Sequence, residues 1–372
     1  MAGLLFWMTL CGLAPAQPAP KLAYAAIDLD RVYGRRLASA ATTMPQAISP
    51  RQAISPPQAM PATRSAPRPL VDAIRRDGQP WNLSVNAGVT ADSNVTNATD
   101  DRFLSFRQGD VTIPVELSPA FRARSGIGRG ASVSGGVKLR LSDGAAIAVS
   151  AEGHAQDYKG GRNDDISFLL AAGPELTWSE GRSASLQVTA GDSWYGGTST
   201  SRGVGLRARY SVRIAQGKTV SLFADARSFK SGYGRAFGGE QANVYLGASA
   251  VLDPVTTASF GLFARREWLR DDAYSNFETG LYGGVSRYLG SMFTGSVTAG
   301  FSRTVYDAPL LFLSDEKRDD LRFNAGVSLT TREPIGMGVY PTIGYSYNRT
   351  DGSIDFFDAD RHRVRLGVRR TF

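Results

Sequence analysis

The last eleven residues of the chain alternate strictly between two kinds of side chain. From His362 to Phe372 the sequence reads His, Arg, Val, Arg, Leu, Gly, Val, Arg, Arg, Thr and Phe. Consecutive side chains of a β-strand point to opposite faces, so this pattern predicts one strand with an apolar face and a strongly polar face. A transmembrane β-barrel requires this arrangement, because one face of each strand meets lipid and the other meets a polar lumen.

The apolar face of this last strand consists of Val364, Leu366, Val368 and Phe372. An aromatic residue at the end of such a strand resembles the signal by which the bacterial barrel-assembly machinery recognises its clients. We therefore predict that this machinery is a partner of the chain, and that these four residues form the recognition signal.

The same alternation recurs from Trp81 onward. Apolar residues occupy the odd positions from Trp81 to Val89, and polar or small residues occupy the even positions between them. No long apolar run of the kind that a membrane-spanning helix needs follows the first part of the chain. About fourteen strands are predicted, near residues 81–90, 130–142, 145–156, 165–178, 183–192, 202–214, 218–228, 241–252, 256–268, 276–288, 291–303, 320–331, 338–348 and 361–372.

The connections between these strands are alternately short and long. Tight turns rich in Gly, Asp or Pro, such as 142–144, are expected at every second connection, and longer polar loops between them. Closure removes the two edge strands, whose unpaired backbone groups would be costly in lipid. The sequence thus predicts an all-β protein, a transmembrane antiparallel outer-membrane β-barrel of about fourteen strands. Both termini should lie in the periplasm, and the barrel should contact outer-membrane lipid and lipopolysaccharide.

The first eighty residues have a different character. Residues 1–26 resemble an export signal, with an apolar stretch and small-residue patterns that predict cleavage after Ala16 or Ala25. The one cysteine, Cys11, lies in this segment, so the mature chain would have no disulfide framework. Residues 27–80 contain the repeated Gln-Ala-Ile-Ser-Pro at 46–50 and 52–56, and predict a Pro-rich disordered periplasmic linker. The barrel would then occupy residues 81–372.

The formal net charge of +8 has a predicted location. Basic residues fall on the polar faces of several strands and would line the lumen: Lys138, Arg140, Arg207, Arg209, Arg213, Arg265, Arg322, Arg363, Arg365 and Arg369. Two interpretations stay open. The arginines either pack against Glu152, Glu175, Asp225 and Glu278 and brace the wall, or they form an electropositive channel wall that favours anionic cargo.

Patterns for catalysis and metal binding are poor. His154 has a lumen-side position, whereas His362 has a lipid-side position that the lumen-facing Ser346 of the neighbouring strand cannot reach. Four acidic pairs, at 100–101, 164–165, 271–272 and 319–320, are expected as exposed charges in outer loops, or as ligands of divalent cations near lipopolysaccharide. We predict no enzymatic activity, no cofactor and no metal. The basic charge is distributed through a barrel, which predicts no nucleic-acid partner.

The end of the first strand carries a more specific element. Asp92, Ser93 and Asn94 are followed by Asn97 and Ala98. This element resembles the opening of the barrel domain of surface lipoprotein assembly modifiers, in which a strand ends in an Asp-Ser-Asn turn followed by Asn-Ala. The resemblance covers about residues 81–372. Asp and Asn at these positions also favour an Asx-type turn, which explains the element without any function.

The resemblance implies a fourteen-stranded translocon that moves lipoproteins or secreted proteins across the outer membrane. Members of the family usually carry a periplasmic tetratricopeptide domain before the barrel, and residues 27–80 are too short and too Pro-rich for one. The expected function is therefore non-enzymatic export or surface display of a lipoprotein or secreted cargo. A passive porin-like channel for small anionic solutes and a structural or adhesive surface barrel are the alternatives.

Overall fold

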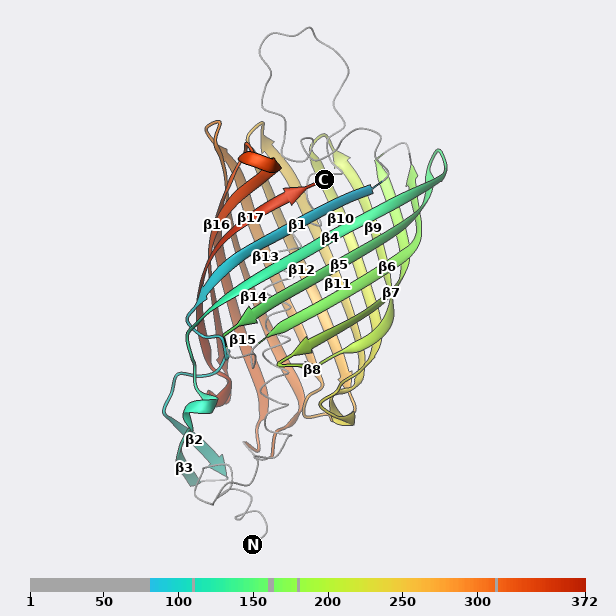
Figure 1. Cartoon of the computed structure of the whole chain (residues 1–372). Helices are drawn as coiled ribbons and strands as arrows, with labels where there is room; N and C mark the ends of the chain where they lie inside the picture. The colour runs from blue at the N-terminus through green and yellow to red at the C-terminus, as the bar shows by residue number, and fades with distance from the viewer. Residues whose placement is uncertain (1–80, 109–110, 160–163, 179–180, 312–313) are drawn as a thin grey trace.

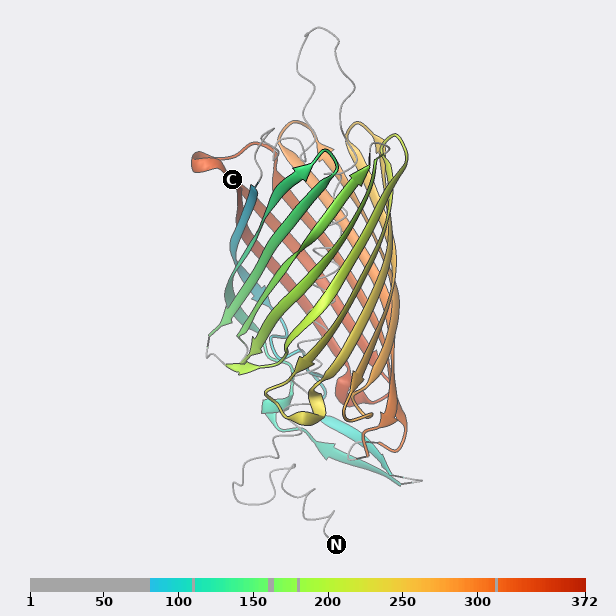
Figure 2. The same cartoon turned by 90° about the vertical axis from the view of Figure 1, so that its right-hand side faces the viewer.

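A computed structural model describes residues 81–372 except for 109–110, 160–163, 179–180 and 312–313. The signal and linker predicted for residues 1–26 and 27–80 lie outside the described residues. Fourteen long strands form one tilted sheet (Figures 1 and 2). They are β1 (Trp81–Asp92), β4 (Gly126–Ser142), β5 (Ala145–Tyr158), β6 (Asp165–Trp178), β7 (Arg182–Tyr195), β9 (Arg202–Ala215), β10 (Lys218–Lys230), β11 (Gly239–Asp253), β12 (Thr256–Leu269), β13 (Asn276–Leu289), β14 (Phe293–Pro309), β15 (Lys317–Thr331), β16 (Val339–Gly352) and β17 (Ala359–Thr371).

The sheet closes on itself, so the predicted barrel is confirmed. Each long strand pairs antiparallel with its neighbours, and the first strand, β1, pairs with both β4 and the last strand, β17. At this seam Gly88 lies opposite Gly367. An added Cβ on Gly88 would lie 2.4 Å from the Leu366 carbonyl oxygen, so only glycine fits this close approach. Closure leaves none of the long strands with an open edge.

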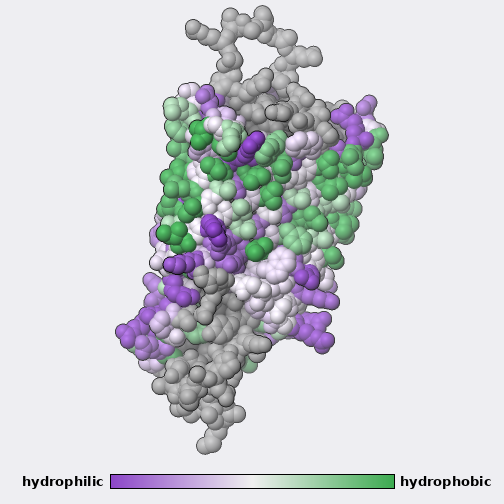
Figure 3. Space-filling view, viewed as in Figure 1, coloured by the Kyte–Doolittle hydropathy of each residue, from purple (hydrophilic) through white to green (hydrophobic). Residues whose placement is uncertain are grey.

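Outward and inward side chains differ as the alternation predicts. Large apolar residues at outward positions, such as Leu206 and Leu366, are exposed, whereas Glu267 and Glu278 at inward positions are buried. Figure 3 shows these apolar residues as a belt on the outer surface. Trp81 and Trp178 lie at one edge of the belt, where interfacial aromatic residues are common in outer-membrane barrels.

The two rims of the barrel differ in their connections. The short-turn rim holds 143–144, 179–181, 216–217, 254–255, 290–292 and 332–338, together with Trp81 and Phe372. The long-loop rim holds 93–125, 159–164, 196–201, 231–238, 270–275, 310–316 and 353–358. Glycines with positive φ at Gly181, Gly217 and Gly290 permit tight turns at the short-turn rim. The predicted alternation of short and long connections is therefore confirmed except at 332–338, which is as long as most connections of the other rim.

Extra elements occur mainly at the long-loop rim. A hairpin of β2 (Phe103–Gln108) and β3 (Val111–Glu116), which was not predicted, lies within the first long connection and projects beyond the barrel (Figure 1). Shorter elements are β8 (Thr198–Ser199), η2 (Pro119–Phe121), η3 (Arg235–Phe237) and η5 (Asp355–Phe357), while η4 (Gly336–Gly338) lies at the short-turn rim. Within the described part of the chain, no helix is long and apolar enough to cross a membrane.

Candidate functional site

Eight of the ten basic residues that we predicted as lumen residues lie on four strands. They are Lys138 and Arg140 on β4, Arg207, Arg209 and Arg213 on β9, Arg322 on β15, and Arg363 and Arg365 on β17. The residues between them on the same strands, such as Leu139, Leu206 and Leu366, are exposed on the outer surface. Alternation along a strand therefore places the eight basic side chains on the lumen face.

Lys138, Arg207 and Arg322 have acidic partners, and the partners of Arg322 belong to the network described below. Lys138 of β4 forms an ion pair with Glu175 of β6. Arg207 Nε lies 3.7 Å from Asp225 Oδ2 of β10, and its guanidinium lies 5.3 Å from the centre of the Phe223 ring. These contacts connect strands across the lumen face, as the bracing interpretation of the basic residues requires.

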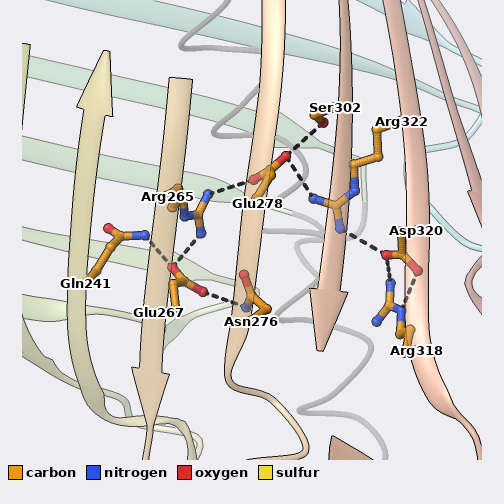
Figure 4. Close-up of polar contacts among 9 residues, drawn as sticks. All are labelled: Gln241, Arg265, Glu267, Asn276, Glu278, Ser302, Arg318, Asp320 and Arg322. Carbon is orange, nitrogen blue, oxygen red and sulfur yellow. Dashed lines mark hydrogen bonds and ion pairs between the residues drawn. The ribbon is translucent and has the colours of Figure 1, made fainter. Parts of the chain in front are cut away.

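A larger polar network crosses the lumen face from β11 to β15 (Figure 4). Its nine residues are Gln241, Arg265, Glu267, Asn276, Glu278, Ser302, Arg318, Asp320 and Arg322. In its first half, Arg265 Nη2 lies 2.5 Å from Glu267 Oε1, and Arg265 Nη1 lies 3.8 Å from Glu278 Oε2. Glu267 also accepts hydrogen bonds from Gln241 and, at 3.2 Å, from Asn276. Glu267 is 0% exposed, so these partners replace the water that its charge has lost.

The second half of the network continues through Glu278. The Ser302 hydroxyl donates to Glu278 at 2.8 Å, and Arg322 Nη1 lies 3.8 Å from Glu278 Oε1. Arg322 Nη2 lies 3.2 Å from Asp320 Oδ2, and Arg318 Nε donates to Asp320 Oδ1 at 2.8 Å. Three arginines therefore face three carboxylates, and this wall is charge-balanced.

One sequence prediction about this wall was wrong. We expected the acidic pair at 319–320 as exposed charges in an outer loop, but β15 begins at Lys317 and Asp320 is 0% exposed. The strand continues beyond the apolar belt, where its polar sequence resembles that of a loop. Sequence reasoning did not single out Gln241, Glu267, Asn276, Ser302 or Arg318 as lumen-wall residues. A usable signal was the spacing of two between opposite charges, as in Arg265 and Glu267, which places both side chains on one face.

Other lumen-facing arginines lack such partners. Arg140, Arg209 and Arg365 form no ion pair with any residue in the described ranges. The neighbours of Arg365 across the two adjacent strands are Thr90 of β1 and Gly344 of β16, which carry no charge. We call the charge-balanced wall formed by β11 to β15 the braced side of the lumen. We call the wall that carries Arg140, Arg209 and Arg365 the basic side.

An apolar cluster lies next to the network at the long-loop rim. Its buried members are Phe229, Phe237, Leu269, Tyr274, Leu310 and Phe357, contributed by strand ends and by four of the long connections. Phe229 and Leu269 have inward positions on their strands, so the cluster lies on the lumen side of the rim. The Arg318 guanidinium lies 3.4 Å from the centre of the Phe357 ring and links the cluster to the network.

The connection between β16 and β17 contains a carboxyl group with an altered pKa. Burial raises the pKa of Asp358 to about 6, although the Gly352 N–H donates to its Oδ1 at 2.7 Å and acts in the opposite direction. The nearby carboxylates of Asp351, Asp355 and Asp101 contribute to this rise. Near neutral pH this connection therefore holds a partly buried negative charge among other negative charges.

The family-like turn lies at the seam that closes the barrel. The Asn94 N–H donates to Asp92 Oδ1 at 3.0 Å, so the expected Asx turn forms. The Ser93 N–H donates to the His362 carbonyl oxygen at 2.9 Å, and Asn94 Nδ2 donates to the Asp360 carbonyl oxygen at 3.0 Å. These bonds join the end of β1 to the start of β17.

Two further features strengthen this seam. Asp92 accepts two hydrogen bonds from Arg361 Nε, at 2.9 and 3.0 Å, and one at 2.7 Å from the Tyr158 hydroxyl of β5. Asn97 adopts a left-handed conformation with φ of 48°, which asparagine tolerates well. The turn residues therefore join the first and last strands of the barrel. The sequence pattern predicted only that they form a local turn.

The predicted assembly signal lies on the outer surface of the same seam. Val364, Leu366, Val368 and Phe372 have outward positions and are exposed. The Phe372 N–H donates to the Leu83 carbonyl oxygen at 2.9 Å, and the Arg370 guanidinium lies 4.3 Å from the Phe372 ring centre. This places the four residues together on the lipid-facing surface, where the barrel-assembly machinery remains a predicted partner.

No catalytic arrangement forms around the histidine on the lipid side. His362 Nδ1 lies 2.8 Å from the Tyr345 hydroxyl, whereas Ser346 lies opposite Arg363 and faces the lumen. Across the described ranges, no group of three His, Cys, Asp or Glu side chains could hold a metal ion.

Comparisons with known proteins place the chain in a family. No curated protein sequence matches it. Three solved structures that resemble it are an outer-membrane channel of Pseudomonas putida F1, the DcaP channel of Acinetobacter baumannii and an anion-selective porin of Comamonas acidovorans. Their sequence identities are 11%, 10% and 11%, and their TM-scores are 0.40, 0.43 and 0.39. The matches cover 80%, 78% and 78% of this chain, and 98%, 96% and 98% of the three structures. The sequence profile of the surface lipoprotein assembly modifiers matches residues 81–372, so the chain is an outer-membrane β-barrel that belongs to this family.

Proposed function

We propose that this barrel is a translocon that assists the export or surface display of lipoproteins or secreted proteins. The observation that carries the proposal is the family match over the whole barrel, residues 81–372, since the family description names surface lipoproteins as the objects of assembly. The short-turn rim with both barrel ends would face the periplasm, and the long-loop rim would face outward, as is usual in outer-membrane barrels.

The lumen wall is compatible with this role. The network from β11 to β15 ties five strands together through buried side chains, which favours a stiff wall on one side. The apolar cluster at the long-loop rim, which includes Phe237 and Phe357, packs against that same side of the lumen. A passing cargo would therefore meet the basic side of the lumen more readily than the braced side.

A second candidate function is a passive channel for small anionic solutes. The observation that favours it is the set of lumen-facing arginines that lack an ion pair with a described residue, namely Arg140, Arg209 and Arg365. Unpaired cations in a pore attract anions and repel cations. The channel function requires an open path through the lumen. The translocon function requires a cargo protein whose export depends on this barrel.

The two candidates predict different results when the gene is deleted. For the translocon, surface-exposed lipoproteins encoded near the gene should fall on intact cells while their total amounts stay constant, and a plasmid-borne copy should restore them. For the porin, surface exposure should be unchanged, and the purified barrel should give steady anion-selective conductance in planar bilayers. Unchanged surface exposure in the deletion strain would refute the translocon.

A further inference from the structure

The outer surface at the long-loop rim carries a repeated pair of side chains. Three of the outward-facing arginines at this rim, on β4, β9 and β14, are Arg129, Arg202 and Arg303. The residue two positions away on each strand, Ile127, Val204 and Val305, is an exposed apolar residue of the outward face. The three arginines therefore lie on the outside of the barrel, next to the apolar belt, at positions spaced around its circumference.

Each of these arginines is held in the same way by an aspartate of an adjacent strand. Arg129 Nε donates to Asp157 at 2.7 Å, and Arg202 Nε donates to Asp192 at 2.5 Å. In both pairs, neither Nη atom donates a hydrogen bond to a described residue. The aspartate thus fixes the orientation of the guanidinium through Nε and leaves the Nη atoms available as hydrogen-bond donors.

The third arginine follows the same arrangement with one difference. Arg303 donates to Asp319 through Nε, at 3.0 and 3.1 Å, and through Nη2 at 2.5 Å, while Nη1 donates no hydrogen bond to a described residue. All three side chains remain well exposed, with 83%, 72% and 60% of the surface of Arg129, Arg202 and Arg303 accessible. Three oriented, exposed guanidinium groups with free donors therefore surround the barrel.

The position of these guanidinium groups beside the apolar belt indicates which part of the membrane they meet. A side chain that borders the apolar belt of an outer-membrane barrel meets lipid headgroups rather than bulk water. On the face drawn in Figure 3, hydrophilic side chains likewise gather toward the long-loop rim, below the apolar belt. Guanidinium groups bind phosphate through parallel N–H donors, and they keep their charge at every physiological pH.

We propose that Arg129, Arg202 and Arg303 bind phosphate groups of lipopolysaccharide, the phosphorylated glycolipid of the outer leaflet. The proposal does not depend on the transport function. It assigns the long-loop rim to the outer leaflet, because that glycolipid occurs only there.

Two other arginines serve as matched controls. Arg266 lies on the outward face of the same rim, but both of its Nη atoms donate to Asp307 and only 26% of its side chain is accessible. Arg287 has an outward position at the short-turn rim, where Nη1 donates to Thr256 at 3.1 Å. The first control tests whether free donors matter, and the second tests whether the rim matters.

The test is a titration of the detergent-purified, full-length barrel with fluorescent lipopolysaccharide. The triple variant R129Q/R202Q/R303Q should bind about tenfold more weakly than the wild type, as three exposed charge contacts imply. R266Q and R287Q should bind as the wild type does. Heat-modifiable migration on gels verifies that each variant is folded as a barrel.

Two further probes identify the chemical group that is bound. Dephosphorylated lipopolysaccharide should bind the wild type no more tightly than intact lipopolysaccharide binds the triple variant. Phosphatidylglycerol, which carries a single phosphodiester, should lose less affinity in the triple variant than lipopolysaccharide does. The proposal is overturned if the folded triple variant keeps wild-type affinity, if R266Q or R287Q loses as much, or if either lipid probe behaves otherwise.

Discussion

The two sides of the lumen use the same residue type in different ways. On the braced side, Arg265 is buried between Glu267 and Glu278, and its charge is balanced within a few ångströms. On the basic side, Arg365 lies between the uncharged Thr90 and Gly344. Lumen-facing arginines therefore belong to two classes, those that are paired with buried carboxylates and those that have uncharged neighbours. The neighbours of each arginine across the sheet decide whether removing charge there affects stability or the field in the pore.

The largest effect is expected on the braced side, from Glu267→Ala. This change leaves Arg265 buried beside one carboxylate and removes the acceptor for Gln241 and Asn276. We expect a loss of about 5 kcal/mol in the free energy of unfolding, near the upper end for breaking a buried ion pair. Urea titration of the barrel refolded into vesicles measures it.

A matched change on the other side provides the control for Glu267→Ala. Glu152 has an inward position on β5 and is exposed, so Glu152→Ala should alter stability by less than about 1 kcal/mol. Equal losses for the two variants would show that burial within the network does not distinguish the two sides.

The closing seam contains a buried ion pair of the braced kind, although it adjoins the basic side. Asp92→Ala removes the partner of Arg361, which is 3% exposed, and the acceptor of the Tyr158 hydroxyl. We expect a loss of about 3 kcal/mol, measured as a lower temperature for the gel shift from folded to unfolded barrel. Asn86→Ala, on the same strand, should cost no more than about 1 kcal/mol, the value of an ordinary hydrogen bond. A milder effect of Asp92→Ala than of Asn86→Ala would contradict a closing role for the turn.

A smaller effect should depend on pH, through Asp358 beside the apolar cluster. Its pKa rises from the ordinary 3.8 to about 6 in the folded protein, so the folded state favours the protonated carboxyl. The stabilisation is complete below about pH 4 and is lost as the pH rises through about 6. Partial exposure reduces the effect, and we expect the wild type to gain about 1 kcal/mol between pH 7 and pH 5 relative to Asp358→Asn. If the urea midpoints of the two proteins change by the same amount between pH 7 and pH 5, Asp358 does not make stability depend on pH.

The fold could be predicted from the sequence because a strand in a membrane barrel has a simple constraint. Alternation at Val364, Leu366 and Val368 identified the strand and its lipid face without knowledge of any partner strand. All fourteen long strands were predicted in this way. The hairpin of β2 and β3 was missed because it lies outside the membrane, where alternation with lipid no longer applies.

The contacts of the lumen wall were much harder to predict. Arg265 meets Glu278 only because β12 and β13 pair in one register, and a shift by one residue would turn either side chain to the other face. Asp320 was grouped with the polar residues Lys317 to Asp319 that precede it, and so it was expected as an exposed charge of the outer loop. Which arginines are paired therefore depends on the register of neighbouring strands, which single-strand patterns do not contain.

The smallest effect in free energy tests the basic side directly. Two charges are removed in R209Q/R365Q, and each contributes about 0.5 kcal/mol to the potential felt by an ion about 8 Å away in water. Salt at about 0.1 M roughly halves this potential. Because the change acts with opposite sign on chloride and potassium, the chloride-to-potassium permeability ratio in planar bilayers should fall about fivefold, with unfolding unchanged. R207Q/D225N is the matched control, because it removes an ion pair without altering the net charge. If the control lowers the ratio as much, or if R209Q/R365Q leaves it unchanged, the basic side does not set the field in the pore and its arginines act as braces as well.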